Sequence, residues 1–130
     1  MKACTTFGAS GSTRESSRGL VRAIVADTPV TAVAHLTCVG ASRAEVATLV
    51  GEFLDEGVRS ILALRGDPPK DQPDWRPHPQ GLAYASELVE FIRGEKYPFC
   101  LGGACYPEKH VEASDLDTDL GNLIAKVNAG

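Results

Sequence analysis

The feature that most constrains the fold of this chain is a regular alternation of short apolar runs with amphipathic helical segments. Each apolar run is closed by a turn or a polar cluster, which is typical of buried strands. The runs cover residues 2–7, 30–36, 60–64 and 98–104. Strands separated by helices favour a parallel sheet joined by right-handed crossovers. The sequence therefore predicts an α/β fold of parallel βα repeats.

The helical segments carry start and stop signals. Ser12 and Ser42 each precede a glutamate by three residues, as in a capping box. Gly57 and Gly94 are expected to end the second and third helices, and the last two helices are expected over residues 84–93 and 116–129. Apolar side chains at helical spacing are expected to face the core. They are Leu20, Val21, Ile24 and Val25, then Val46, Leu49, Val50, Phe53 and Leu54, then Leu88, Val89 and Ile92, then Leu116, Leu120, Leu123 and Val127.

Two architectures satisfy this order. One is an open doubly wound sheet, and the other is part of a (β/α)8 TIM barrel, which takes about 250 residues when complete. Four βα units in 130 residues amount to half a barrel, with two open strand edges and an unfilled interior. No internal boundary is visible, so residues 1–130 are expected to form a single partial-barrel domain. The proline-rich stretch 68–81 is expected to be a loop, of a length that is often functional.

Composition and charge exclude several classes of function. The chain is 43% hydrophobic and 23% charged, which is ordinary for a globular protein, and no run is long enough to span a membrane. A net charge of −4 argues against a nucleic-acid partner.

The four cysteines form no CxxC pair, so we expect no metal site. They lie in or just after apolar runs, where cysteine is commonly buried. With no recognisable secretion signal, the expected location is the cytoplasm.

Polar side chains follow the end of every expected strand, in residues 6–11, 35–38, 65–67 and 106–110. Parallel strands bring their carboxyl ends to one rim, where these residues can surround a single ligand. Each piece also has a plainer interpretation. The glycines in 8–11 could cradle a phosphate or only make a turn, and the histidine in 35–38 could contact a ligand or bond to backbone.

The same ambiguity holds for the other candidates. Arg65 and Asp67 could form a structural ion pair, or they could position an anionic group and an electron-accepting ring. Tyr106 could stack on a flat ring or merely cover the barrel mouth. Asp119 and Lys126 could be ordinary solvated charges on the last helix.

Several motifs, taken together in this order and spacing, resemble the methylenetetrahydrofolate reductase family. They are Thr6-Phe7-Gly8-Ala9, His35-Leu36-Thr37-Cys38, Leu64-Arg65-Gly66-Asp67, Tyr84-Ala85-Ser86-Glu87-Leu88 and Tyr106-Pro107-Glu108-Lys109-His110. The closing segment 119–130 fits as well, so the likeness covers essentially the whole chain.

The resemblance implies a TIM barrel that holds FAD at its C-terminal rim. NADH or NADPH would pass hydride to the flavin, which would reduce methylenetetrahydrofolate to methyltetrahydrofolate. Thr6 would lie near the nicotinamide and the substrate, and Asp67 would be the catalytic carboxylate between flavin and folate. The implied FAD contacts are Thr6, Phe7, Ala9, His35, Arg65, Gly66, Asp67, Ala85, Tyr106, His110, Ala113, Asp119, Asn122 and Lys126.

Departures from the family pattern qualify this expectation. The family's general-acid glutamate on the first strand has no counterpart here, a later strand with a substrate-binding glutamine is missing, and Ala125 replaces a frequent arginine. We therefore expect a fragment spanning the second to fifth βα units, inactive alone, and leave open whether its full-length parent is a homo-oligomer. One alternative is a small α/β binding module for a phosphorylated metabolite without redox chemistry. Another is a non-functional remnant that aggregates through open strand edges.

Overall fold

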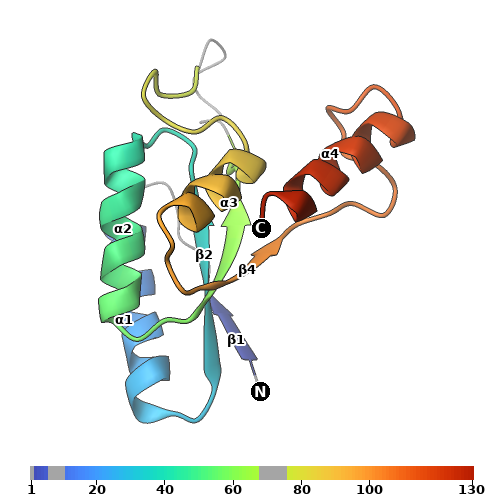
Figure 1. Ribbon diagram of the computed structural model, residues 1–130. Coiled ribbons are helices and arrows are strands. Elements are labelled where there is room, and N and C mark those ends of the chain that lie inside the picture. The colour runs from blue at the N-terminus through green and yellow to red at the C-terminus, as the bar shows by residue number, and fades with distance from the viewer. Residues whose placement is uncertain (1, 6–10, 68–75) are drawn as a thin grey trace.

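The computed structural model describes residues 2–5, 11–67 and 76–130, and all structural statements refer to these. Strands and helices alternate along the whole chain, as the sequence predicts (Figure 1). The elements are β1 (Lys2–Thr5), α1 (Gly11–Asp27), β2 (Thr31–Thr37), α2 (Arg43–Asp55), β3 (Ser60–Leu64), α3 (Ala85–Gly94), β4 (Cys100–Gly103) and α4 (Leu116–Asn128).

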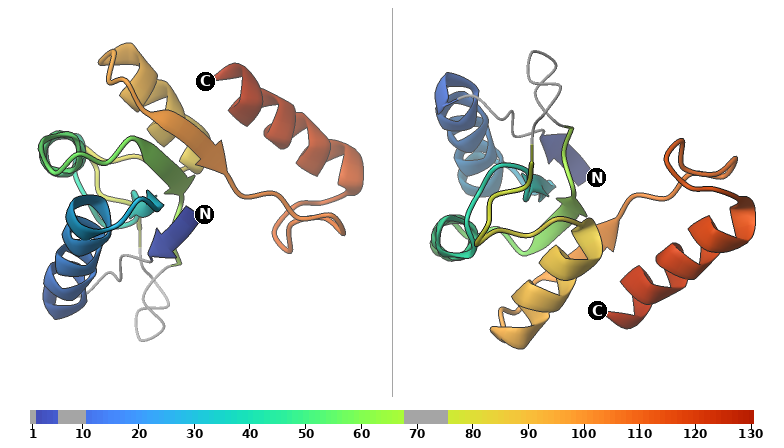
Figure 2. Two further views of the ribbon diagram at one scale, coloured as in Figure 1. Left: turned by 90° about the horizontal axis from the view of Figure 1, so that it is seen from below. Right: turned by 90° about the horizontal axis from the view of Figure 1, so that it is seen from above.

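The four strands form one parallel sheet in the order β1-β2-β3-β4. Each crossover therefore moves one strand further in the same direction, as in a barrel, whereas a doubly wound sheet reverses its direction. Helices α1, α2 and α3 lie on one side of the curved sheet, and α4 lies beyond β4 (Figure 2). Of the two architectures, the structure has that of a partial barrel, with β1 and β4 as its edges.

The core lies between the sheet and helices α1 to α3. Along β2, buried residues alternate with partly exposed ones, because successive side chains point to opposite faces of a strand. The predicted stripes of α2 and α3 supply the helical side of this core. The buried residues include Ala32, Ala34, Leu36, Ile61 and Ala63 from the sheet and Val46, Val50, Phe53, Leu88, Val89 and Ile92 from the helices.

Helix α2 has the caps that its sequence predicts. The Glu45 N–H donates to Ser42 Oγ over 3.2 Å, and the Ser42 N–H donates to a Glu45 carboxylate oxygen over 2.8 Å. At the other end Gly57 has φ +83°, and the Val58 N–H donates to the Phe53 carbonyl over 2.9 Å. This is a Schellman motif, in which a left-handed glycine satisfies the last carbonyls of a helix.

Two predicted helix boundaries are wrong. Helix α1 begins at Gly11, so Ser12 lies within its first turn and cannot be its N-cap. Helix α3 continues through Gly94, and the left-handed position falls on Lys96 with φ +60°. The Tyr97 N–H then donates to the Ile92 carbonyl over 3.3 Å. Because Tyr97 packs against the core, the hydrophobic contact that accompanies this motif sets the end of the helix there.

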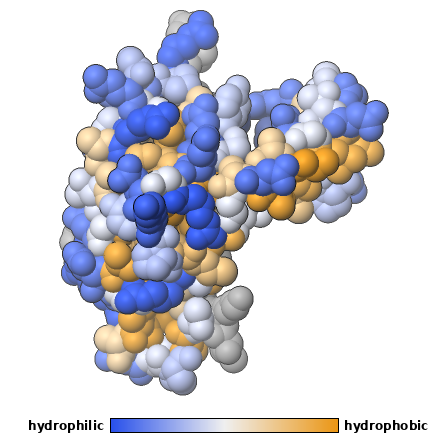
Figure 3. Space-filling view, in the orientation of Figure 1, coloured by the Kyte–Doolittle hydropathy of each residue, from blue (hydrophilic) through white to orange (hydrophobic). Residues whose placement is uncertain are grey.

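The prediction that the α4 stripe belongs to the core is also wrong. Leu116, Leu120 and Val127 are 51%, 46% and 67% exposed, and no residue of α4 is buried. The reason is position, because α4 lies outside the edge strand β4 and packs mainly on α3. Apolar surface therefore runs along this arm of the molecule (Figure 3). Leu20 of α1, at the opposite edge, is likewise exposed.

The described part of the predicted loop is tied to α2, whereas residues 68–75 lie outside the described ranges. Gly81 forms an isolated antiparallel bridge with Ser42, and the Arg43 N–H donates to the Gln80 carbonyl over 2.9 Å. A Cβ on Gly81 would clash with the Ala41 carbonyl oxygen, so this close approach needs glycine. Of the helices described, none is long and apolar enough to cross a membrane.

Candidate functional site

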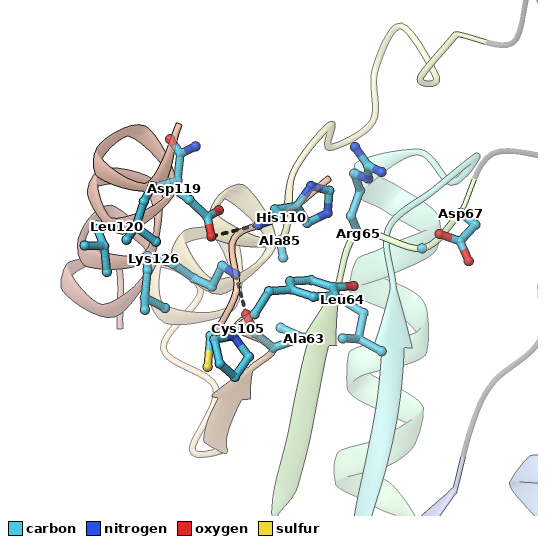
Figure 4. Close-up of a pocket in the computed structure, with 17 residues that line it drawn as sticks. Ala63, Leu64, Arg65, Asp67, Ala85, Cys105, His110, Asp119, Leu120 and Lys126 are labelled. Atoms are coloured by element: carbon cyan, nitrogen blue, oxygen red, sulfur yellow. Dashed lines mark hydrogen bonds between the residues drawn. The ribbon is translucent and has the colours of Figure 1, made fainter. Parts of the chain in front are cut away.

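A hollow of about 420 Å³ opens where β3 and β4 end and α4 begins (Figure 4). A second hollow of about 680 Å³ adjoins it, since the two share Arg65, Ala85 and Lys126. These volumes are in the range of small-molecule sites. The sequence-predicted residues that line the first hollow are Arg65, Gly66, Asp67, Ala85, Tyr106, His110, Asp119, Asn122 and Lys126, and Ala113 lines the second.

Gly66 places Arg65 and Asp67 at the rim. The Val39 N–H donates to the Arg65 carbonyl over 2.9 Å, which extends the β2–β3 pairing past the end of β3. Gly66 follows with φ +86°, and a Cβ there would lie 2.5 Å from Val39 Cγ1. Glycine is therefore required twice, for its backbone conformation and for close packing. Asp67 lies at the side of the hollow opposite Asp119 (Figure 4).

Arg65 forms an ion pair with Glu112 and not with Asp67. Its two terminal nitrogens donate to the two carboxylate oxygens of Glu112 over 2.6 and 2.9 Å. This hydrogen bonding raises the pKa of Arg65 and lowers the pKa of Glu112. The alternative of a structural Arg65–Asp67 pair is therefore wrong, and Asp67 is left exposed at the rim.

The loop between β4 and α4 is ordered by contacts among site residues. The His110 N–H donates to Asp119 Oδ2 over 3.0 Å, and the Glu112 N–H donates to His110 Nδ1 over 3.1 Å. The centroids of the Tyr106 and His110 rings are 4.9 Å apart and the rings are nearly perpendicular, which is a favourable aromatic geometry. Because Nδ1 accepts this bond, the neutral imidazole carries its proton on Nε2.

Lys126 is anchored from α4 onto the end of β4. Its Nζ donates to the Ala104 carbonyl over 2.8 Å. A Cβ on Gly103 would lie 2.9 Å from Lys126 Cδ, so the methylene chain occupies the space that glycine leaves. Asp119 and Lys126 thus both hold the fold together at the hollow, and neither is an ordinary solvated charge.

The N-terminus of α3 faces the second hollow. Its N-cap, Tyr84, is 60% exposed and makes no side-chain cap hydrogen bond. Tyr84, Ala85 and Ser86 line this hollow together with Arg65. First-turn amides and the positive end of the helix dipole favour an anion at such a position. The Arg65 guanidinium beside them is paired with the Glu112 carboxylate, which lines the same hollow.

Of the remaining predicted residues, the structure describes only His35. Thr6, Phe7 and Ala9 lie outside the described residues. His35 is paired in register with Leu62, two positions before the end of β2, and does not line either hollow. Partial burial lowers its pKa.

Three cysteines have described side chains, and each is a free thiol. Cys38 is buried as expected, and burial raises the pKa of its thiol to about 11, which leaves it protonated and inert. Cys100 and Cys105 are exposed, so the expectation of a buried cysteine in the fourth apolar run is wrong, because β4 is an edge strand. Within the described ranges, no group of three or more metal-binding side chains comes together.

Among the lining residues that the sequence did not predict, Glu112 is the one that pairs with a predicted site residue. Glu112 lies in the loop after β4, two residues beyond His110. This position next to a predicted site residue was the feature of the sequence that could have indicated it. Its partner is 47 residues away, so no local pattern could have paired the two side chains.

Parallel βα units wound in one direction, with a ligand-sized hollow at the carboxyl ends of the strands, define a βα-barrel type of ligand-binding domain. The pattern of the methylenetetrahydrofolate reductase family matches residues 3–130. The chain belongs to this family, which confirms the resemblance seen in its motifs.

Individual relatives agree with this assignment. The chain is 40% identical over 126 residues to methylenetetrahydrofolate reductase 1 of Schizosaccharomyces pombe, covering 96% of this chain and 21% of the relative. It is 36% identical over 127 residues to 5,10-methylenetetrahydrofolate reductase of Escherichia coli, covering 96% of this chain and 40% of the relative. The chain therefore spans about a fifth to two fifths of the length of these relatives.

Proposed function

We propose that this chain forms the FAD-binding rim of a methylenetetrahydrofolate reductase. The observation that carries the proposal is the shared hollow, in which β3, α3, α4 and the loop after β4 bring together residues far apart in the sequence. These are largely the residues to which the family motifs assign FAD contacts.

The chemistry of the hollow suits a ligand with both a diphosphate and a flat ring. Arg65 and the N-terminus of α3 lie side by side and favour an anion. Tyr106, 55% exposed at the rim, offers an aromatic face. Ala63 and Leu64 add apolar lining. FAD has both a diphosphate and a flat ring, so the residues present fit it.

Bound FAD would supply hydride transfer between NADH or NADPH and methylenetetrahydrofolate. The protein's own contribution is charge and orientation. Asp67 presents a carboxylate at the rim, where it would disfavour negative charge on a neighbouring ring and favour positive charge on a folate. His110 presents Nε2–H, since its Nδ1 is occupied. Because the chain spans two fifths or less of its relatives, we propose folate turnover for the parent protein and cofactor binding for this single domain.

The direct test is a titration of the purified chain with FAD, followed by flavin fluorescence and by the yellow colour of the separated protein. We expect saturable uptake, and we expect Arg65→Ala to weaken it by roughly tenfold, the value of one charge-assisted hydrogen-bonding group. Arg43→Ala, which removes an exposed arginine of α2, is the control. A chain that takes up no FAD would contradict the proposal. Uptake of inorganic pyrophosphate without FAD would favour the phosphorylated-metabolite module instead.

The role of Asp67 is tested in the full-length parent. Asp67→Asn should slow the reduction of methylenetetrahydrofolate and leave FAD bound, because the amide keeps the shape and removes the charge. Folate turnover at the wild-type rate would refute the role given to this carboxylate.

A further inference from the structure

We propose that Glu112 is a positioning residue, which orients the Arg65 guanidinium toward an anionic group in the hollow. The inference takes its ligand, FAD, from the proposed function. It takes its geometry from the ion pair, and none of the motifs quoted for the family contains Glu112.

The ion pair fixes the plane of the guanidinium and leaves one edge free. Both terminal nitrogens of Arg65 are engaged by the Glu112 carboxylate. Among the residues that the structure describes, Nε of Arg65 has no hydrogen-bond partner. Since the guanidinium is a rigid planar fork with donors on two edges, the edge that carries Nε remains available to a ligand.

Glu112 is itself held by a series of contacts that begins on α4. Asp119 accepts a hydrogen bond from the His110 N–H, and His110 Nδ1 accepts one from the Glu112 N–H. The Glu112 carboxylate then binds Arg65 at the end of β3. A rotation of the Arg65 side chain is thus opposed by backbone contacts that reach the next βα unit.

The solvent exposure of the Arg65–Glu112 ion pair separates a role in positioning Arg65 from a role in stabilising the fold. The side chains of Arg65 and Glu112 are 28% and 57% exposed, and exposed ion pairs contribute little to folding stability. Binding responds differently, because an arginine that is already ordered loses less side-chain freedom when the ligand arrives. Loss of Glu112 should therefore change affinity much more than the melting temperature.

The test compares FAD affinity in the wild-type chain, Glu112→Ala and Glu112→Gln, with Glu108→Ala as the matched control. Glu108 is an exposed carboxylate of the same loop that forms no ion pair within the described residues. We expect Glu112→Ala to weaken binding by roughly two- to tenfold, the cost of ordering one long side chain. Glu112→Gln, which keeps a hydrogen-bond acceptor, should restore most of the affinity, and Glu108→Ala should bind as the wild type does.

A double-mutant cycle shows whether Glu112 acts through Arg65. Glu112→Ala should cause no further loss in an Arg65→Ala background. The proposal is overturned if Glu112→Ala binds FAD as tightly as the wild type, or if its effect persists without Arg65.

A second readout separates this proposal from the proposed function. The Arg65 Nε–H resonance reports the order of the guanidinium without any flavin, and inorganic pyrophosphate serves as the probe anion. If the wild type takes up no FAD, a pyrophosphate-induced shift of this resonance that is weaker in Glu112→Ala supports the positioning role while the proposed function fails. If the wild type takes up no FAD and pyrophosphate leaves the resonance unchanged, both proposals fail.

Discussion

The β2–α2 unit and the β4–α4 unit have the same order of elements but very different surroundings. Helix α2 has three buried side chains and a complete set of caps, whereas α4 has none buried. Glu56, which follows α2, also accepts hydrogen bonds from Arg18 and Arg22 of α1. Yet α4 and the loop before it supply much of the hollow, while α2 supplies none of its lining.

This difference separates the scaffold from the candidate site. The residues that would bind a ligand lie on the least buried unit, where local opening has a low free-energy cost. The well-packed unit instead determines whether the chain folds at all. Substitutions in the two units should therefore affect different measurements.

The largest expected effect comes from the buried side of α2. Phe53 is fully buried, and Phe53→Ala should cost about 3–5 kcal/mol of unfolding free energy, a large part of the stability of a small domain. Urea denaturation measures the loss. Ile124→Ala, at an α4 position that is 60% exposed, should change stability by less than about 0.5 kcal/mol. Equal losses would contradict the contrast between α2 and α4.

Gly66 tests the junction between scaffold and site. Gly66→Ala combines a left-handed backbone with a Cβ 2.5 Å from Val39, so we expect a loss of about 1–3 kcal/mol and a displaced Arg65. Gly51→Ala is the matched control, because Gly51 lies inside α2 with nothing near its Cβ. That change should stabilise the helix by about 0.5–1 kcal/mol. A neutral Gly66→Ala would show that the rim tolerates a side chain.

The end of α3 offers a smaller test, in which two changes should both stabilise. Lys96→Gly removes a side chain from a left-handed position, and Gly94→Ala replaces a glycine inside the helix that has open space at its Cβ. Each should raise the unfolding free energy by about 0.5–1 kcal/mol. If Gly94→Ala destabilises the chain in thermal melts, the helix ends at Gly94, as the sequence first suggested.

The smallest expected effect is the pH dependence that His35 contributes. Burial lowers the pKa of His35 below its model-peptide value of 6.5, so the unfolded chain binds the proton more tightly than the folded one. Stability therefore falls as the pH drops through about 6.5 toward the lower, folded pKa. His35→Gln should flatten this decline in melting temperature, and His78→Gln, which removes an exposed imidazole, is the control. An unchanged decline in His35→Gln would contradict this contribution.

Local signals in the sequence predicted the scaffold well. The strand-like apolar run at residues 30–36, the Ser42–Glu45 capping box and the Gly57 stop each depend on a few neighbouring residues, and the structure confirms them. Errors arose where packing between distant segments decides the outcome. Lys96 takes the left-handed position because Tyr97 meets the core.

The candidate site could be predicted only in outline for the same reason. Parallel topology implied that Arg65, Asp67 and Tyr106 would share a rim, and they do. The pairing of Arg65 with Glu112 depends on side chains that only the folded loop brings together. The separation of His35 from the hollow depends on strand register, which the apolar pattern alone does not specify.

Lys126 shows how one glycine in a strand can fix the position of a charge in the hollow. Its methylene carbons lie over Gly103 and its ammonium is tethered to the Ala104 carbonyl, so much of the freedom of this long side chain is already lost on folding. The other two N–H groups of the ammonium remain available to a ligand. A bulkier residue at position 103 would displace the Lys126 ammonium. A substitution in β4, outside the hollow, would therefore change the electrostatic potential inside the hollow.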